Sequence, residues 1–291
     1  MLATAAATPG LWDWSLNPPL LLILGLALLY RIGARRTVTP ERTRHAQRWR
    51  SACFYGALAI LLIALSSPLD ALSEKLFWAH MVQHVLLMLV AAPMIVLAKP
   101  WIRLWRAIGL ESRQRIARGL SVGRRAEPLR RLSRFLGTPA VSFVLFSVVL
   151  LGWHVPAMFE ATLRSEALHA LEHSLFFATS LLFWKQVIPS APLRIALDDA
   201  RRVLFAIGAM IVSWVLAVVL ALAPHPLYAS YAHLASRPGG ISALADQQLA
   251  AGIMWVPGSV TFLIVVFVYV HRWLMPRSAA SSRSPRLAGE H

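Results

Sequence analysis

Cysteine is almost absent from this sequence, and charged residues are scarce. Cys53 is the single cysteine among 291 residues, which excludes a disulfide framework, a paired-cysteine redox motif and a thiolate copper site within one chain. Charged residues make up 14% of the chain and hydrophobic residues 57%, which is outside the range of ordinary soluble domains. The composition therefore predicts a membrane protein, in which any metal chemistry must use histidine, methionine or carboxylate.

Acidic residues are also few, since 13 Asp and Glu stand against 29 Lys and Arg and give a formal net charge of +16. In a soluble protein such a charge favours a nucleic-acid partner. Here the basic residues alternate with long apolar runs instead of coating one face, so no nucleic-acid partner is expected. Basic residues are missing before the first apolar run, which argues against a cleaved signal peptide and favours a retained span.

Seven apolar stretches approach the roughly 20 residues that a helix needs to cross a bilayer. They are residues 16–32, 52–66, 77–97, 141–155, 168–188, 203–223 and 249–270. Each is too continuously apolar to be a barrel strand, in which polar and apolar residues alternate. The predicted fold is an all-α integral membrane protein, a bundle of seven transmembrane helices within residues 1–275, followed by a disordered cytoplasmic tail at 276–291.

The basic residues predict the orientation of this bundle. On the seven-span model three of the 29 lie on one side, namely Lys75, Arg164 and Arg237, and the other 26 lie opposite. By the positive-inside rule the rich side is cytoplasmic, so the N-terminus is extracytoplasmic and the C-terminus cytoplasmic. The longest connection, residues 99–138, becomes a basic cytoplasmic loop that we expect to contact anionic lipid headgroups.

Seven of the ten histidines lie at the predicted extracytoplasmic ends of the spans. Two pairs have i, i+4 spacing, in the strings HMVQH (His80 and His84) and HALEH (His169 and His173). This spacing puts both imidazoles of a pair on one helix face, about one turn apart. Neutral imidazole is a ligand for zinc, copper, iron and nickel, so each pair can chelate one ion.

Two further polar residues enter the membrane at the same level. His154 closes the fourth span before Pro156, where the helix should stop or kink, and Asp246 opens the seventh span beside Gln247. Intramembrane polar groups are costly unless paired, so four helices that present them at one depth indicate a functional site. The predicted metal ligands are His80, His84, His154, His169, His173 and Asp246, with Asp246 or Glu172 as acceptors for free imidazole N–H groups.

The other soft or aromatic donors receive a structural interpretation. Met88 and Met254 lie one to two turns deeper than the histidines, where a thioether would favour Cu(I), but packing is the more common role of such residues. His225 and His233 are interpreted as interfacial polar residues of the loop after the sixth span.

Five strings, taken in order, resemble the multispan CtaG family of cytochrome c oxidase assembly factors: HMVQHVLLMLVAAPMIVLAKP, WHVP, HALEHSLFFATSLLFW, PLYASYAH and DQQLAAGIMWVPG. The resemblance covers residues 67–273 and five of the seven spans. It implies a multi-pass protein of the bacterial cytoplasmic membrane that is not an enzyme. It further implies a metallochaperone role in respiratory-chain biogenesis, with copper handled at the extracytoplasmic face and cytochrome c oxidase subunits as partners.

Three other functions remain open from the residues alone. A b-type haem protein that transfers electrons needs two histidines on opposite faces of the haem, which His84 and His173 can supply. A membrane zinc hydrolase fits the H-x-x-E-H pattern of HALEH, with Glu172 as base. A copper transporter needs ligands across the whole membrane, whereas the polar residues here stop in the outer half, so binding without translocation is the favoured interpretation.

Overall fold

The computed structural model describes residue 14 and residues 17–121, 123–192, 197–234 and 236–275. The predicted disordered tail at 276–291 lies outside the described residues. Within them the secondary structure is helical and contains no strand, which confirms the all-α prediction.

A helix lies at each of the seven predicted spans. They are α1 (Pro18–Arg35), α2 (Arg44–Ser66), the continuous α4 (Phe77–Val85), η2 (Leu86–Ala91) and α5 (Ala92–Ala98), then α9 (Pro139–Trp153), α11 (Glu166–Val187), α12 (Asp199–Leu222) and α14 (Ala243–Leu274). Shorter helices connect them: η1 (Glu41–Thr43), α3 (Pro68–Ser73), α6 (Trp101–Ala107), α7 (Leu110–Ser121), η3 (Arg124–Ala126), α8 (Glu127–Leu136), α10 (Pro156–Arg164), α13 (Ala229–Ala232) and η4 (Pro238–Gly240).

Five of the described helices are long and apolar enough to cross a membrane: α1, α2 with η1, the α4–η2–α5 helix, α12 and α14. A sixth candidate combines α9 with the preceding η3 and α8, which meet it at a bend of 77°. Helix α11 is not among the candidates, because its first half carries two histidines and two glutamates in place of apolar residues. The number of seven spans therefore stays a prediction.

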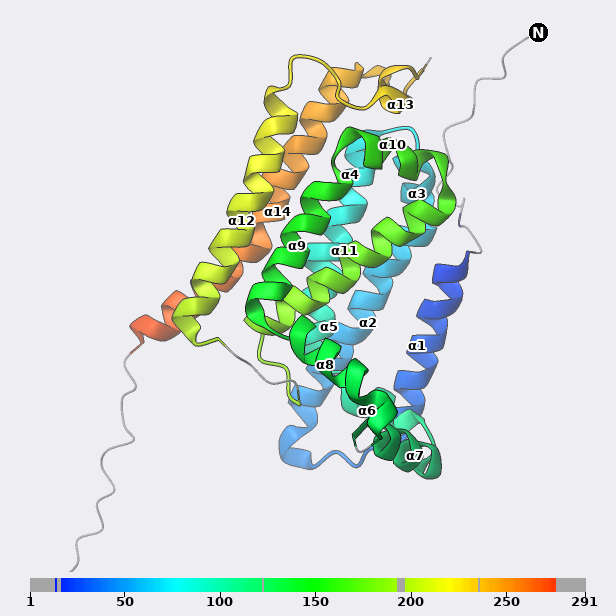
Figure 1. Cartoon of the computed structure of the whole chain (residues 1–291), viewed down its shortest axis with the longest axis vertical. Helices are drawn as coiled ribbons and strands as arrows, with labels where there is room; N and C mark the ends of the chain where they lie inside the picture. Colours follow the sequence, from blue (N-terminus) through cyan, green and yellow to red (C-terminus); the bar gives the residue numbers. More distant parts are fainter. Residues whose placement is uncertain (1–13, 15–16, 122, 193–196, 235, 276–291) are drawn as a thin grey trace, which may run out of the picture.

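The bundle has two chemically different ends. Helices α3, α10 and α13 lie at one end, which we call the histidine end, and α6, α7 and α8 lie at the other, the arginine end (Figure 1). The predicted loop at 99–138 is thus largely helical, and its helices α7 and α8 are mostly exposed. Contact with lipid headgroups at this end stays a prediction.

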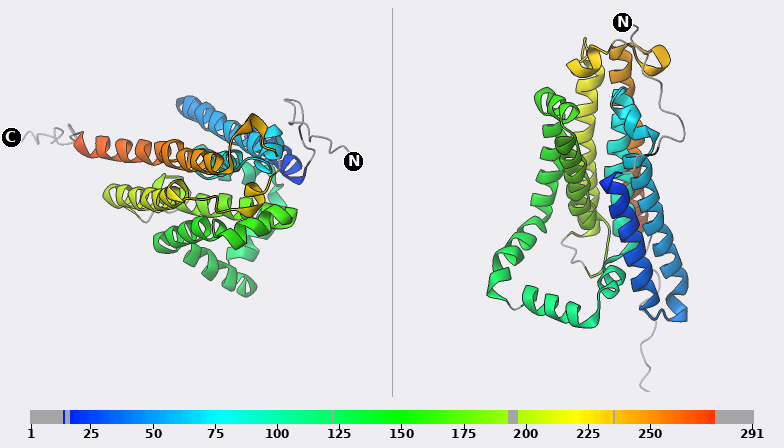
Figure 2. Two further views of the ribbon diagram at one scale, coloured as in Figure 1. Left: turned by 90° about the horizontal axis from the view of Figure 1, so that it is seen from above. Right: turned by 90° about the vertical axis from the view of Figure 1, so that its right-hand side faces the viewer.

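The α4–η2–α5 helix is the centre of the bundle. In its most apolar window 67% of the residues are buried within the protein, compared with 17% for α1. It packs against α2 along its length and against α11 through η2 and α5, and α14 packs beside α4 and α12 (Figure 2). Side chains on its first turns therefore face neighbours on several sides and not lipid.

Halfway along this central helix, η2 is a π-helical segment. Pro93 follows it and has no N–H, so carbonyls one turn earlier lose their usual donor. The indole N–H of Trp184 donates to the Met88 carbonyl at 2.8 Å, and the Thr261 hydroxyl donates to the Leu89 carbonyl at 2.9 Å. Side chains of α11 and α14 thus stabilise the irregular turn below the histidines, a position where π segments are often functional.

Candidate functional site

Helix α4 begins with a cap supplied by another helix. Its own N-cap residue, Leu76, makes no capping hydrogen bond through its side chain. Instead the backbone N–H groups of Phe77 and Trp78 each donate to a carboxylate oxygen of Asp246 at 2.9 Å. A buried carboxylate at a helix N-terminus satisfies orphan donors and complements the helix dipole. Asp246 therefore fixes the first turn of α4 against α14 and so positions the next turn, where His80 lies.

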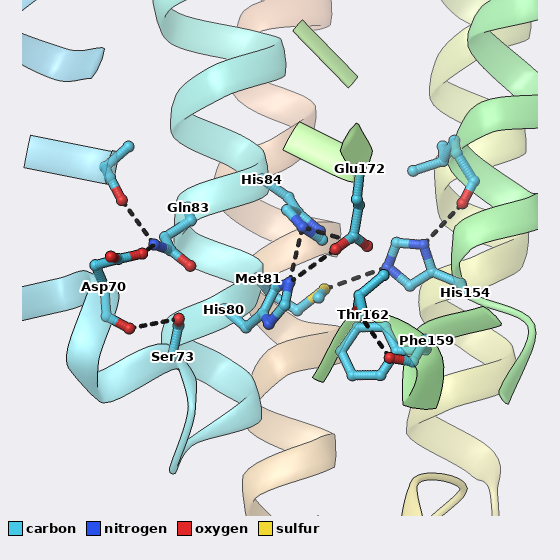
Figure 3. A network of polar contacts seen from close by, with 12 residues as sticks. Asp70, Ser73, His80, Met81, Gln83, His84, His154, Phe159, Thr162 and Glu172 are labelled. Carbon is cyan, nitrogen blue, oxygen red and sulfur yellow. Dashed lines mark hydrogen bonds and ion pairs between the residues drawn. The ribbon is translucent and has the colours of Figure 1, made fainter. Parts of the chain in front are cut away.

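Four buried side chains from α4 and α11 converge to form what we call the four-residue group. His80, His84, Glu172 and His173 each offer one potential ligand atom, and these atoms all lie within 4.8 Å of one another. Nε2 of His80 and Nε2 of His84 are 3.0 Å apart, and they lie 3.6 and 3.8 Å from the two carboxylate oxygens of Glu172. Figure 3 shows these three side chains pointing toward one another between the helices.

The tautomer of His80 follows from a chain of hydrogen bonds. The Tyr231 hydroxyl donates to the backbone carbonyl of Ser73, which can only accept. Burial, reinforced by nearby carboxylates, raises the pKa of the Tyr231 phenol well above its usual range, so it keeps its proton. Nδ1 of His80, 3.3 Å from the same phenolic oxygen, then donates to it in the neutral ring. The lone pair on Nε2 of His80 is left facing His84 and Glu172.

His154 lies beside the four-residue group as the C-cap of α9. Its Nδ1 donates to the Leu150 carbonyl at 2.7 Å, so in the neutral ring Nε2 carries the lone pair. Nε2 of His154 is 3.3 Å from the sulfur of Met81 (Figure 3). The ring centroids of His154 and His84 are 5.8 Å apart. Tyr228 donates to the backbone carbonyl of His154 at 3.0 Å and holds this end of α9 in place.

His169 completes a cluster of five imidazoles. Its ring centroid is 4.2 Å from that of His173 and 5.1 Å from that of His80. Phe159 and Phe176 pack against the cluster, with ring centroids 5.0 Å from His80 and 4.4 Å from His84. An apolar wall of this kind excludes water and leaves the polar atoms to one another.

Several ring nitrogens of the cluster lack a partner. Nδ1 of His84, Nε2 of His169 and Nε2 of His173 are buried and make no hydrogen bond within the described chain. Buried polar atoms are rarely left unpaired, because each costs about 1–3 kcal/mol. Neutral imidazole with a free lone pair is a metal ligand, so this donor set fits a metal ion.

The geometry also fits a single ion. A tetrahedral ion with bonds of about 2 Å brings its ligand atoms to roughly 3.3 Å from one another. Ligand atoms already within 4.8 Å need only small side-chain rotations to reach that spacing. Three imidazoles and one carboxylate would hold a divalent or monovalent ion without thiolate, in keeping with a chain that has one cysteine.

Five of the six predicted site residues lie in this cluster: His80, His84, His154, His169 and His173. Asp246 lies outside the four-residue group because both its oxygens cap α4, and its role as a ligand stays a prediction. His225 and His233 are exposed and are not members of the four-residue group. Gln247 binds the Leu227 N–H and the Leu220 carbonyl through its amide, which ties α14 to the end of α12.

Three residues have a place at the site that the sequence did not assign to them. The sequence predicts Glu172 as a base or as an acceptor for a free imidazole N–H, whereas it lies in the four-residue group itself. It is three residues after His169, so the helical period already puts it on the same face. Tyr231 and Met81 carried no spacing signal, because their partners come from other elements.

The comparisons with known proteins agree with the motifs that lie at this site. A family model for the cytochrome c oxidase caa3 assembly factor (Caa3_CtaG) matches residues 28–275. No curated protein and no solved structure matched the chain. The matched residues run from within α1 to the end of α14 and include the whole histidine cluster, and this chain belongs to the cytochrome c oxidase caa3 assembly factor family.

Proposed function

We propose that the protein binds a copper ion through the four-residue group and delivers it to a haem–copper oxidase during assembly. The observation that carries the proposal is the convergence of three buried imidazoles and one buried carboxylate at a single point. Imidazole is a good ligand for copper, and family membership supplies the oxidase as the client. Such a role requires binding and release of the ion but no catalysis, so we propose that the protein is not an enzyme.

The proposal includes an orientation in the membrane. We infer seven spans, with α11 crossing beside α9, and the histidine end facing the extracytoplasmic side of a bacterial cytoplasmic membrane. The arginine end then lies against anionic lipid headgroups on the cytoplasmic side. This orientation follows from the basic residues, since three of the 29 lie in loops of the histidine end. Oxidase subunits would meet the protein at that end.

The geometry supports ion binding over a haem protein and over a zinc hydrolase. A haem needs two imidazoles on opposite faces of a wide macrocycle, whereas the His84 and His173 rings are 5.5 Å apart with Glu172 and His80 beside them. In a zinc hydrolase of the H-x-x-E-H type Glu172 would act as base while both histidines of HALEH bind zinc. Here Glu172 lies among the potential ligands with His173, and His169 is outside the four-residue group.

Single alanine variants at His80, His84, His173 and Glu172 test the proposal. Each should weaken metal binding by roughly 10- to 100-fold or more, because removing one ligand breaks the coordination shell. Metal content of the purified protein after dialysis against chelator-buffered copper is the measurement. His225→Ala and His233→Ala are the matched controls, since these exposed histidines are not members of the group.

The cellular measurement is oxidase activity in a strain without this protein, grown under copper limitation. Activity should fall while the oxidase polypeptides are still made, and the four variants should fail to restore it. Wild-type metal content in all four variants, or full oxidase activity in the deletion strain, would refute the proposal.

A further inference from the structure

We infer that Met81 and His154 form a second, soft metal subsite beside the four-residue group, through which Cu(I) enters or leaves it. This inference rests on the proposed function and specifies the oxidation state and the route of the ion. It places a thioether ligand at Met81, the second residue of HMVQH, whose spacing assigns a role only to the two histidines.

Met81 and His154 meet in a buried contact between two helices. Nε2 of His154 lies 3.3 Å from the sulfur of Met81, and the two side chains belong to different helices, α9 and α4. Met81 is fully buried and His154 is 5% exposed. The thioether sulfur thus faces a ring nitrogen of the imidazole.

Hydrogen-bond direction shows what this contact can bind. The Leu150 carbonyl takes the hydrogen on Nδ1 of His154, so in the neutral ring Nε2 offers a lone pair. A thioether sulfur also offers lone pairs and has no hydrogen to donate. Two acceptors that face each other gain little from the contact itself, and a cation between them would be bound by both.

The donor types select the cation. Thioether and neutral imidazole together suit Cu(I), a soft monovalent ion, whereas the carboxylate and three imidazoles next to them also suit Zn²⁺ or Cu²⁺. An N–Cu–S arrangement needs a separation on the order of 4 Å between nitrogen and sulfur. Rotation of the unbranched methionine side chain can provide the additional distance.

The subsite directly adjoins the four-residue group. The ring centroids of His154 and His84 are 5.8 Å apart, and Met81 follows His80 directly in α4. An ion held by Met81 and His154 can therefore pass to His84 by exchange of ligands, with no change of oxidation state. Met88 and Met254 are also buried, but their sulfurs have no contact of this kind with an imidazole among the described residues.

The test compares Cu(I) with Zn²⁺ on full-length protein in detergent. Met81→Leu keeps the volume and apolar character of the side chain and removes only the sulfur. We expect this variant to bind Cu(I) about 10- to 100-fold more weakly, by anaerobic competition with a Cu(I)-specific chelator, while its Zn²⁺ affinity is unchanged. Met88→Leu and Met254→Leu are the matched controls and should leave both affinities at the wild-type value.

A second measurement needs no variant at Met81. Copper X-ray absorption of Cu(I)-loaded protein carrying Cys53→Ser should show a sulfur neighbour at about 2.3 Å, and the two control substitutions should leave it in place. Nitrogen and oxygen neighbours alone would overturn the inference, even where Met81→Leu fails to fold. Wild-type Cu(I) affinity in Met81→Leu would overturn it but leave the proposed function standing, whereas wild-type protein that binds neither ion would overturn both.

Discussion

At the scale of single residues, the hydrogen bond made by Nδ1 decides which nitrogen of His80 and of His154 is free to bind a metal ion. His80 and His154 both direct Nδ1 toward an acceptor, a phenol in one case and a carbonyl in the other. Both therefore expose Nε2 to the interior of the cluster. Residues that never touch the ion thus decide whether a lone pair is available to bind it, as in many metal sites.

Tyr231→Phe removes the phenolic acceptor of the His80 Nδ1–H while it keeps the aromatic ring that packs on Phe77. The imidazole then loses the contact that fixes its tautomer, and we expect metal affinity to fall about 10-fold or more. Metal titration of the purified variant is the measurement. Tyr269→Phe, which removes a hydroxyl bonded to the Val187 carbonyl, is the control and should retain wild-type affinity. Equal affinity in both variants would mean that Tyr231 does not orient His80.

The sequence was informative where ligands share a helix and less so where they do not. The i, i+4 period placed His80 beside His84 and His169 beside His173, and the structure brings both pairs into one cluster. Tyr231 lies on a four-residue helix in a loop, where no period relates it to α4. Its role depends on tertiary packing, which a single sequence does not encode in a readable spacing.

At the scale of elements, Asp246 acts as a cap between helices. From the sequence alone, an Asp near the start of a helix is predicted to be a ligand or to cap its own helix. Here the carboxylate instead accepts from two N–H groups of α4, a contact that appears only when α14 and α4 pack side by side. The sequence therefore predicted that Asp246 lies near the start of the last helix, while its partners on α4 could not be predicted.

Asp246→Ala leaves two N–H groups at the start of α4 without their acceptor. We expect it to lower the free energy of unfolding by about 1–3 kcal/mol, because each N–H is left in a buried place. Thermal unfolding in detergent measures the loss. Asp246→Asn keeps one acceptor oxygen and should lose less.

The Asn variant also separates capping from metal binding. If Asp246 only caps α4, the folded fraction of Asp246→Asn should bind as much copper as wild type. A loss of metal with no loss of stability would instead make Asp246 a ligand.

The helices themselves were largely predictable, because long apolar runs fix where a helix can lie in lipid. Helix α2 begins at Arg44, eight residues before the predicted start at 52. Its first two turns consist mostly of polar residues, so a search for apolar runs does not detect them. Helix α11 shows the opposite difficulty. Its histidines and glutamates, which form part of the candidate site, lower the mean hydropathy of α11 below that of a clear membrane span.

At the scale of the whole molecule, the two ends of the bundle should face opposite compartments. Ser121 lies on α7 at the arginine end, and Ser236 lies in the loop between α13 and η4 at the histidine end. Both are exposed, whereas the native Cys53 is buried. These positions allow the orientation to be measured in a Cys53→Ser background.

Ser121→Cys and Ser236→Cys should react with an impermeant thiol reagent from opposite sides of the membrane. With the histidine end outside, Ser236→Cys is labelled in intact spheroplasts and Ser121→Cys only after permeabilisation. Labelling of both from the same side would contradict the predicted topology, and the reverse pattern would place the candidate metal site in the cytoplasm.

The π-helical segment gives the central helix two halves with different angular phases. A π turn holds more residues than an α turn, so η2 sets the direction in which His80 and His84 point relative to everything after Ala92. Deleting two residues within 86–91 would remove the π turn and one residue more: the first deletion restores an α-helical path with little change of phase, and the second rotates the first half by about 100° around the axis. The chain should still insert into membranes, but both imidazoles would turn away from Glu172 and copper binding should be lost. A shortened chain that retains copper would show that the phase of this helix is not what assembles the site.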